Sequence, residues 1–298
     1  MPDPGGAWTI KRLLEWTAPF FARKDVDSPR LSAELLLGHV LNVPRIKLYT
    51  DYERVISDKD LAEFRALVQR AAEQEPVAYL TGKAHFFSLE FEVTRDVLIP
   101  RPDTETLVEN VLQLARNQMG FEAPRVLDLC TGSGCVAAAI AHHLKAANVV
   151  AVDNSAAAIE VARRNISKLG LDERVTIQDG DLFSALKELP DSQPFDLIVA
   201  NPPYIATSKI ETLDRSVRDF EPLVALDGGL DGLNLHRRIL DAAGAHLRTG
   251  GRIFLEIAFD QAEQALEVMR SDGKLFDEAR VLKDHAGNDR VLTGRRRE

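Results

Sequence analysis

The hydrophobic positions change their spacing part-way along the chain. From residue 8 to about residue 74 they recur every three or four positions, which is the period of an amphipathic helix. From Arg125 onward, short apolar runs rich in β-branched residues alternate with helical stretches. That alternation is typical of buried parallel strands joined by helices. The chain is therefore predicted to have a helical first half and a doubly wound α/β second half.

Three helices are predicted in the first half. The first has an apolar face made by Leu13, Leu14, Thr17 and Phe21. The second begins at Ser28-Pro29, because proline suits the first position of a helix, and closes at Pro44. Its predicted apolar stripe consists of Leu31, Leu35, Leu36, Val40 and Leu41. The third opens at Ser57, with Asp60 three residues later.

Aromatic and β-branched residues nearly alternate between Gly82 and Pro100, which predicts a β-hairpin that links the two halves. The expected domains are a helical domain at residues 1–80, a hairpin linker at 81–100 and a third domain at 101–298. In the third domain, strands are predicted at residues 126–129, 149–152, 175–177, 197–200 and 253–257. Helices are predicted between them, at residues 136–145, 156–169 and 233–247.

Composition excludes several classes of protein. The 298 residues are 45% hydrophobic and 28% charged, which suits a globular protein and excludes disordered, collagenous and fibrous chains. Apolar runs such as residues 135–141 are far shorter than the roughly 18 residues of a membrane span. Residues 1–11 lack the basic and apolar segments of a secretory signal, so a cytoplasmic protein is expected.

The formal net charge of −9 disfavours broad, sequence-independent binding to DNA, which depends on cationic side chains that release phosphate counterions. No stable nucleic-acid binding is expected. The local basic run Arg295-Arg296-Arg297 is interpreted as a solvated, frayed end. Cys130 and Cys135 are interpreted as small buried side chains, because their spacing matches no disulfide framework or zinc site. The seven histidines show no metal-ligand spacing, and no metal is predicted.

A glycine-rich segment follows the first predicted strand. It reads Cys130-Thr131-Gly132-Ser133-Gly134, and with Ala137 it fits the spacing G-x-G-x-x-A at a strand-to-helix turn. Asp153 ends the next strand, where a carboxylate can accept hydrogen bonds from ribose hydroxyls. Phosphate-binding loops and hydrolase elbows are excluded by their spacing. Asp181, after the third strand, either reaches an adenine amino group or serves as a turn residue or helix cap.

The fourth predicted strand ends in Asn201-Pro202-Pro203-Tyr204. Its two prolines fix the backbone and lack N–H donors, so nearby carbonyl groups are held as acceptors. If the Asn201 side-chain oxygen and the Pro202 carbonyl both accept hydrogen bonds from an amide or exocyclic NH2 group, electron density shifts to that nitrogen. Tyr204 could stack on the planar group and orient it toward a methyl donor. The structural alternative is a turn that only ends the strand.

Taken together, these segments resemble an S-adenosylmethionine-dependent N-methyltransferase, and most closely the PrmC/HemK family of peptide chain release factor glutamine methyltransferases. The resemblance also rests on the stretch Leu98-Ile99-Pro100-Arg101-Pro102-Asp103-Thr104-Glu105 and on Phe220-Glu221-Pro222, and it covers nearly the whole chain. It implies an α/β, seven-stranded, Rossmann-like methyltransferase domain with an N-terminal helical bundle and a linking β-hairpin. It also implies methylation of the glutamine side chain in the Gly-Gly-Gln motif of class 1 release factors.

The resemblance implies a role for each part of the site. Residues 130–134 would hold the methionine part of S-adenosylmethionine, and Asp153 its ribose. Asp181 and Leu182 would border the adenine, while Asn201, Pro202, Pro203 and Tyr204 would hold the glutamine, Asn201 also lying beside the cofactor. Two positions depart from the family pattern. This chain has Leu182 where some members have tryptophan, and Ala258 where members commonly have glycine.

Other roles stay open. Arg101, Asp103 and Glu105 either shape the mouth of the site or, as the interpretation we favour, mark a helix start at Pro102-Asp103. The helical domain is expected to dock the protein substrate. Three alternatives to a release factor methyltransferase are a glutamine methyltransferase of a large-subunit ribosomal protein, a DNA adenine N6-methyltransferase acting on a flipped base, and a module without catalytic activity.

Overall fold

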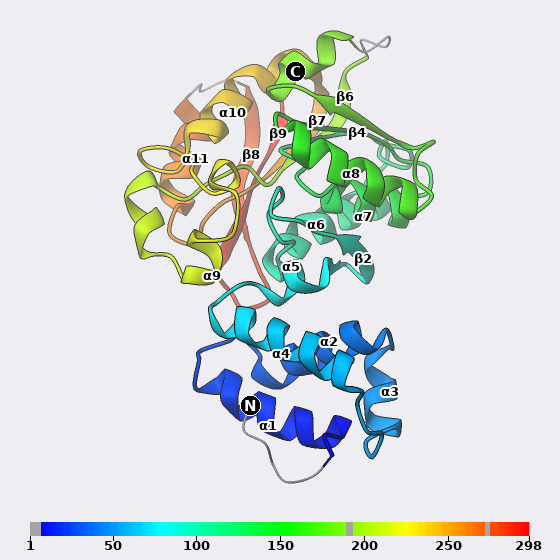
Figure 1. The fold of residues 1–298 in the computed structure, drawn as a ribbon. Helices are drawn as coiled ribbons and strands as arrows, with labels where there is room; N and C mark the ends of the chain where they lie inside the picture. The colour runs from blue at the N-terminus through cyan, green and yellow to red at the C-terminus, as the bar shows by residue number, and fades with distance from the viewer. Residues whose placement is uncertain (1–6, 189–192, 272–274, 298) are drawn as a thin grey trace. The chain divides into compact units, whose positions relative to one another are not determined.

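The computed structural model describes residues 7–188, 193–271 and 275–297 (Figure 1). Six residues of the segment inspected for a secretory signal, residues 1–6, lie outside the described part. The chain divides into two compact units. One consists of Met1–Lys83 with Asp214–Phe220, and the other of Ala84–Leu213 with Glu221–Glu298.

The first unit is helical. Its helices are α1 (Ile10–Ala22), α2 (Pro29–Leu41), α3 (Arg45–Thr50), α4 (Asp58–Ala72), α5 (Val77–Thr81) and α9 (Arg215–Arg218). The predicted apolar face of α1 is confirmed, since Leu13, Leu14, Thr17 and Phe21 are all buried. The predicted start of α4 is also confirmed, because the Ser57 hydroxyl caps it by accepting from the backbone N–H of Asp60 at 3.1 Å.

One expectation for α2 was wrong, and a second was confirmed only in part. The helix ends at Leu41, and Pro44 precedes α3 instead of closing α2. Of the predicted stripe, Leu36 is buried and Val40 and Leu41 pack against the core, but Leu31 is exposed. The helix also buries Ser32, Ala33, Glu34, Leu37 and Gly38. The stripe shifts because Glu34 is inside: its carboxylate accepts hydrogen bonds from Arg30, Arg45 and Tyr49 at 2.5 to 3.1 Å. A hydrophobic pattern assigns every charged residue to the solvent-facing side of a helix. It therefore cannot predict a buried carboxylate that is held by three hydrogen-bond donors.

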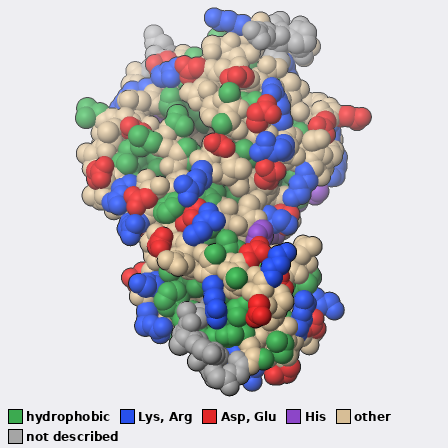
Figure 2. Space-filling model, viewed as in Figure 1, with side chains coloured by type: hydrophobic (Ala, Val, Ile, Leu, Met, Phe, Trp, Pro, Cys, Tyr) green, Lys and Arg blue, Asp and Glu red, His purple; other side chains and the backbone are tan. Residues whose placement is uncertain are grey.

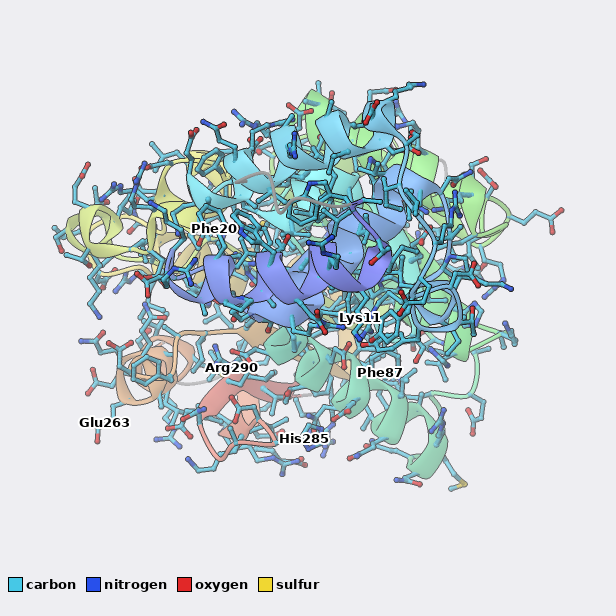
Figure 3. The ribbon with its side chains drawn as sticks, turned by 60° about the horizontal axis from the view of Figure 1, so that its bottom comes forward. Lys11, Phe20, Phe87, Glu263, His285 and Arg290 are labelled. Carbon is cyan, nitrogen blue, oxygen red and sulfur yellow. The ribbon has the colours of Figure 1, made fainter. Side chains whose placement is uncertain are left out.

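The side chains of Trp16 and Phe20 also stack within α1, with ring centroids 4.9 Å apart. Figure 3 labels Phe20 on this helix. This unit therefore has its own apolar core, in which α1, α2 and α4 pack together.

The second unit is built on a seven-stranded sheet. The strands of the chain are β1 (Lys83–Phe86), β2 (Leu89–Glu92), β3 (Arg125–Leu129), β4 (Asn148–Asp153), β5 (Val175–Asp179), β6 (Phe195–Ala200), β7 (Leu247–Glu256), β8 (Phe276–Lys283) and β9 (Asp289–Arg296). The sheet order is β5-β4-β3-β6-β7-β9-β8, parallel from β5 to β7 and antiparallel at β9 and β8. The α/β fold and its seven strands are confirmed.

Helices cover both faces of this sheet (Figure 1). Their bounds are α6 (Glu105–Asn117), α7 (Cys135–His143), α8 (Ala156–Lys168), α10 (Asn234–His246) and α11 (Ala262–Ser271), with short 3₁₀ helices η1 (Pro102–Thr104), η2 (Leu182–Glu188), η3 (Thr207–Thr212) and η4 (Leu223–Ala225). Successive strand residues point to opposite faces, so Val149 packs with the α6–α8 layer and Val150 with the layer of α10, α11 and η2.

The linking hairpin is present as β1 and β2, and residues 93–100 continue without strand structure. Phe86 and Phe91 pack in the core beneath α6, and the backbone N–H of Phe87 donates to the Glu105 carboxylate at 2.8 Å. The structural division falls between Lys83 and Ala84, so most of the hairpin is part of the α/β unit.

The expected frayed end at Arg295-Arg296-Arg297 was wrong. Arg295 and Arg296 belong to β9, which pairs with β7 on one side and β8 on the other. The Arg296 guanidinium donates to the backbone carbonyl of Leu247, and the backbone N–H of Arg297 donates to that of Leu275 at 2.9 Å. Strand pairing between distant segments overrides the local polarity of the sequence.

Basic and acidic side chains are interspersed on the face shown in Figure 2. Within the described ranges, no helix has the length and apolar character needed to cross a membrane.

Candidate active site

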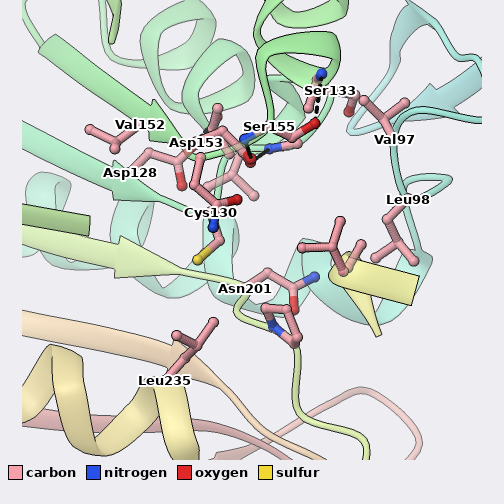
Figure 4. Close-up of a pocket in the computed structure, with 18 of the residues that line it drawn as sticks. Val97, Leu98, Asp128, Cys130, Ser133, Val152, Asp153, Ser155, Asn201 and Leu235 are labelled. Carbon is pink, nitrogen blue, oxygen red and sulfur yellow. Dashed lines mark hydrogen bonds between the residues drawn. The ribbon is translucent and has the colours of Figure 1, made fainter. Parts of the chain in front are cut away.

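A cavity of about 630 Å³ lies at the carboxyl ends of β3, β4, β5 and β6 (Figure 4). This volume is in the range that small-molecule ligands occupy in proteins. Residues from the loops after these strands line the cavity, together with parts of residues 96–104 and 223–229. The connecting helices change from one face of the sheet, where α6–α8 lie, to the other face, where α10 and α11 lie. In doubly wound sheets, ligands bind at the carboxyl ends of the strands where this change occurs, and the cavity lies at that place.

The glycine loop after β3 has two kinds of glycine. Gly132 has φ +56° and lines the cavity, and a Cβ atom there would meet no atom within 4 Å. Gly134 has φ +79°, does not line the cavity, and faces Ala162 of α8 at 3.3 Å from the position of a Cβ atom. The first glycine therefore offers bare backbone to a ligand, and the second lets α7 pack against α8.

Asp153 ends β4 and holds this loop. Its carboxylate accepts from the backbone N–H of Gly132 at 2.8 Å and from that of Ser155 at 3.0 Å (Figure 4). Burial raises the pKa of this carboxyl, while the hydrogen bonds from the backbone act in the opposite direction. Asp153 thus ties the glycine loop to β4 and borders the cavity.

A second carboxyl, Asp128, was missed by sequence reasoning. It is buried inside β3 and lines the cavity, and its Oδ2 accepts from the Thr131 hydroxyl at 2.6 Å and from the Ala137 backbone N–H at 3.2 Å. Burial raises its pKa to about 7. The available signal was an acid inside the otherwise apolar run 126–129, since a charge in a buried strand needs a specific reason.

The predicted adenine-bordering residues both line the cavity. Leu182 is buried and has φ +51°. The Asp181 carboxylate pairs with Arg238 of α10 at 2.6 Å, and its backbone carbonyl accepts from the Ser184 backbone N–H at 3.1 Å. Asp181 therefore both forms a turn and borders the cavity.

Only part of the tetrapeptide after β6 lines the cavity, namely Asn201 and Pro203. The Asn201 side-chain N–H donates to the Thr104 hydroxyl at 3.1 Å, and the Tyr204 hydroxyl donates to the Glu256 carboxylate at 3.2 Å. Pro202 and Tyr204 are not among the lining residues. The expected stacking role of Tyr204 stays a prediction.

Glycines outside the predicted site hold the tetrapeptide in place. A Cβ atom at Gly228 would lie 2.7 Å from the Pro203 carbonyl oxygen, and one at Gly232 would lie 2.1 Å from the Tyr204 carbonyl oxygen. The Gln261 side chain also donates to the Tyr204 carbonyl at 2.9 Å. Sequence reasoning did not identify this glycine-rich segment, although its three glycines within five residues were a signal.

Glu256 lies behind the tetrapeptide at the end of β7 and is fully buried. Burial raises its pKa to about 7, whereas the Thr104 and Tyr204 hydroxyls and the Arg290 guanidinium favour its ionised form. The His236 ring on α10 hydrogen-bonds the Glu256 backbone carbonyl at 2.7 Å, and burial lowers the pKa of His236 to about 4. His236 is therefore neutral and acts as a donor to that carbonyl.

The residues of uncertain role lie beside this group. Arg101 lines the cavity and pairs with the buried Glu221 carboxylate. Asp103 pairs with Arg290 of β9 at 2.9 Å. The predicted helix start is confirmed, since η1 at Pro102–Thr104 leads directly into α6.

The cysteines differ in exposure. Both are free thiols, Cys135 is buried as predicted, and Cys130 is half-buried and lines the cavity. Burial raises the pKa of both thiols, to about 12 for Cys135. Neither thiol is a nucleophile at neutral pH.

Comparisons with known proteins give matches both to the helical part and to the α/β part of the chain. Residues 12–82 match the family described as PrmC N-terminal domain, and residues 103–219 match the Methyltransferase small domain. The release factor glutamine methyltransferase of Geobacter sulfurreducens is 43% identical over 99% of both chains, and that of Rhodopirellula baltica is 41% identical over 96% of both. The chain belongs to the release factor glutamine methyltransferase family.

A solved structure of a release-factor-specific protein-(glutamine-N5) methyltransferase from Alicyclobacillus acidocaldarius is 30% identical, over 70% of this chain and 100% of that chain, with a TM-score of 0.40. As a member of the release factor glutamine methyltransferase family, the chain is an enzyme whose methyl donor is S-adenosylmethionine. The cavity fits that donor, because Gly132 leaves open space where a Cβ atom would stand and Asp153 ends the adjacent strand.

Proposed function

We propose that this enzyme methylates the side-chain amide nitrogen of the glutamine in the Gly-Gly-Gln motif of class 1 release factors. The observation that carries the proposal is Asn201, which lines the cavity at the end of β6 and whose N–H group is already bonded to Thr104. Its side-chain oxygen is then the end left to accept from a substrate amide. The names and near-full-length coverage of the relatives support a release factor as the protein that presents that amide.

In this proposal, residues 130–134 hold the methionine part of S-adenosylmethionine, Asp153 holds its ribose, and Asp181 and Leu182 border its adenine. Bound S-adenosylmethionine supplies an electrophilic methyl group on a sulfonium centre. The exposed backbone of Gly132 and the carboxylate of Asp153 are joined by a hydrogen bond at 2.8 Å, so the loop and the ribose acceptor are held in a common geometry. The aliphatic Leu182 packs on the adenine where some family members have tryptophan.

An amide nitrogen is a poor nucleophile because its lone pair is shared with the neighbouring carbonyl. Asn201 and Pro202 counter this by accepting hydrogen bonds from the glutamine NH2 group, which shifts electron density to nitrogen and aims its lone pair. Among the described residues, none donates a hydrogen bond to the Pro202 carbonyl, which leaves that acceptor for the substrate. Pro203 and Tyr204 complete the pocket for the planar amide.

The chemistry requires no metal and no strong base from the protein. Once nitrogen is alkylated its proton becomes acidic and passes to solvent, so the chain's task is alignment and polarisation of the amide. The thiols of Cys130 and Cys135, whose pKa values are raised, take no part in the transfer.

The helical domain at residues 1–80 is proposed to dock the release factor, since it has a core of its own and contains none of the residues assigned above to the donor or the amide. A variant that lacks residues 1–80 is expected to bind the release factor more weakly while its affinity for S-adenosylmethionine is kept. Equal affinity of the two enzymes for the release factor would contradict the docking role.

Methyl-labelled S-adenosylmethionine tests the function directly. The enzyme is incubated with a class 1 release factor, with its Gly-Gly-Gln Gln→Ala variant, with large-subunit ribosomal proteins, and with DNA. Label is expected in the unmodified release factor alone. Label that persists in the Gln→Ala variant would remove the proposed target, and label in ribosomal protein or adenine would support the competing activities.

A further inference from the structure

Asn165 of α8 has a fully buried side chain that does not line the cavity. Burying an amide costs free energy unless its polar atoms find hydrogen-bond partners. An asparagine side chain has two N–H donors and one carbonyl oxygen. In this protein both N–H groups and the oxygen pair with the backbone of segments outside α8. Asn165 therefore holds those segments in place.

The first of these segments is the glycine loop at residues 130–134. One N–H of Asn165 donates to the backbone carbonyl of Ser133 at 2.9 Å. The same loop is held by Asp153, which accepts from the backbone N–H of Gly132 at 2.8 Å and lines the cavity. The loop is thus held by one side chain at the cavity and by another from the protein interior.

The second segment is strand β2, which ends at Glu92. The other N–H of Asn165 donates to the Glu92 backbone carbonyl at 3.0 Å, and the Asn165 side-chain oxygen accepts from the Glu92 backbone N–H at 2.7 Å. The chain that follows β2 forms a wall of the cavity between residues 96 and 104, and Figure 4 labels Val97 and Leu98 in it. That wall therefore begins at a backbone that Asn165 fixes.

Two surface ion pairs also join α8 to the hairpin. Arg164 pairs with Glu92 and Lys168 with Glu90, both at 2.8 Å. These four side chains are between 35% and 48% exposed, and ion pairs of that kind contribute little to stability. Both pairs reach the hairpin, whereas the bonds of Asn165 reach the hairpin and the glycine loop together.

We propose that Asn165 is a positioning residue for the S-adenosylmethionine site. By holding Ser133 and Glu92 at once, it sets the glycine loop and the wall after β2 in one geometry before S-adenosylmethionine binds. A site that is already ordered loses less conformational freedom on binding, so its affinity is higher. The inference rests on the place given to S-adenosylmethionine in the proposed function, and it does not depend on the identity of the methyl acceptor.

The pair Asn165→Ala and Ile166→Ala tests the inference in the full-length enzyme. Both remove a buried side chain of α8, but Ile166 belongs to the apolar core and does not line the cavity. Asn165→Ala is expected to weaken S-adenosylmethionine binding about 10-fold, the order of effect of a lost buried hydrogen bond, and to leave KM for the release factor within about twofold. Ile166→Ala is expected to lower Tm and to keep S-adenosylmethionine affinity within about twofold.

A purely structural role for Asn165 would lower Tm in both variants without separating their affinities for S-adenosylmethionine. Equal affinities of the two variants, measured by calorimetry below both melting transitions, would therefore overturn the inference. An equal change in KM for the release factor, measured at saturating S-adenosylmethionine, would also overturn it.

If Asn165→Ala does not fold, Asn165→Ser decides. A serine side chain has a single O–H donor, so it cannot hold the Ser133 and Glu92 carbonyl groups together. S-adenosylmethionine affinity is then expected to fall severalfold, and unchanged affinity would refute the bridging role.

Asp153→Ala distinguishes failure of this inference from failure of the proposed function. If S-adenosylmethionine binds elsewhere, Asp153→Ala and Asn165→Ala both keep normal affinity and both proposals fail. If only the positioning role is wrong, Asp153→Ala weakens binding and Asn165→Ala does not. An enzyme that binds S-adenosylmethionine but leaves the release factor glutamine unlabelled would refute the proposed acceptor, and the titrations of Asn165→Ala would still decide the positioning role.

Discussion

The Asp153 carboxylate accepts a hydrogen bond of 2.8 Å from the backbone N–H of Gly132, which joins the ends of two neighbouring strands, β3 and β4. The residue expected to hold the ribose therefore also shapes the loop expected to hold the methionine part. A change at Asp153 should affect the whole cofactor site and not one contact alone.

Asp153→Ala is expected to weaken S-adenosylmethionine binding by about 10- to 100-fold, because hydrogen bonds to a charged group contribute about 1.5–3 kcal/mol. Isothermal titration calorimetry measures the change. Asp241→Ala, an exposed aspartate on α10, is the matched control and should bind the donor normally. Equal affinities in the two variants would show that Asp153 does not hold the cofactor.

Gly132→Ala should weaken S-adenosylmethionine binding, since the added Cβ atom would stand in open space beside the cavity. Gly170→Ala provides a matched control: Gly170 has φ +66° and an equally open surrounding, but it follows α8 and does not line the cavity. Each substitution should lower the free energy of unfolding by about 1 kcal/mol because of its left-handed backbone. Thermal melts of both variants measure the backbone strain, and titrations with S-adenosylmethionine measure the loss of ligand contact. An equal loss of S-adenosylmethionine affinity in both variants would contradict the assignment of Gly132 to the cofactor site.

Asn201→Ala should leave S-adenosylmethionine binding largely in place and lower turnover by about 100-fold or more, as for loss of one polarising group. Single-turnover methylation of a release factor measures the rate, and donor affinity serves as the internal control. Near-normal turnover would rule out Asn201 as the group that activates the amide.

Glu256→Gln should change how stability depends on pH. The pKa of Glu256 is raised from 4.5 to about 7 by burial, so the folded state binds more protons than the unfolded state between these values. Its contribution to stability is full below pH 4.5 and is lost as the pH rises through 7. The facing charged groups are Arg290 and Asp103, with the Tyr204 phenol bonded to the carboxyl.

A glutamine side chain at this position cannot ionise, so thermal melts should show a higher Tm for Glu256→Gln than for the unmodified enzyme at about pH 8, and similar values at about pH 5. The difference in free energy of unfolding at the higher pH is expected to reach about 3 kcal/mol at most. A variant less stable than the unmodified enzyme at that pH would show that the carboxylate is stabilised when ionised, against this assignment.

The strongly patterned elements could be predicted from the sequence because each carries its own signal. Residues 126–129, apart from Asp128, and residues 197–200 are apolar, and they form the interior of β3 and β6. The glycine loop and the prolines after β6 restrict the backbone locally, so their positions at strand ends were also predictable. Strand β9 was not, because its polar ends are ordered only by pairing with β7 and β8.

The candidate site likewise contains residues that the sequence could predict and residues that it could not. Gly132, Asp153 and Asn201 stand out because motif spacing marks them, and all three line the cavity. Asp128, Thr104 and Glu256 carry no comparable spacing. Thr104 is 97 residues away from Asn201 in the chain, and the hydrogen bond between their side chains forms only in the folded protein.

The amino-acid sequence by itself determined the family, the parallel strands and the residues that we propose to meet the donor and the amide, because hydrophobic periods and short backbone motifs act over a few neighbouring positions. Only the tertiary structure decided which buried carboxyls lie behind those residues, which end of Asn201 is already bonded, and that the last arginines pair in a strand. These outcomes depend on burial and on partners far away in the chain, and the free energy of a charge or hydrogen bond cannot be assigned before its surroundings exist.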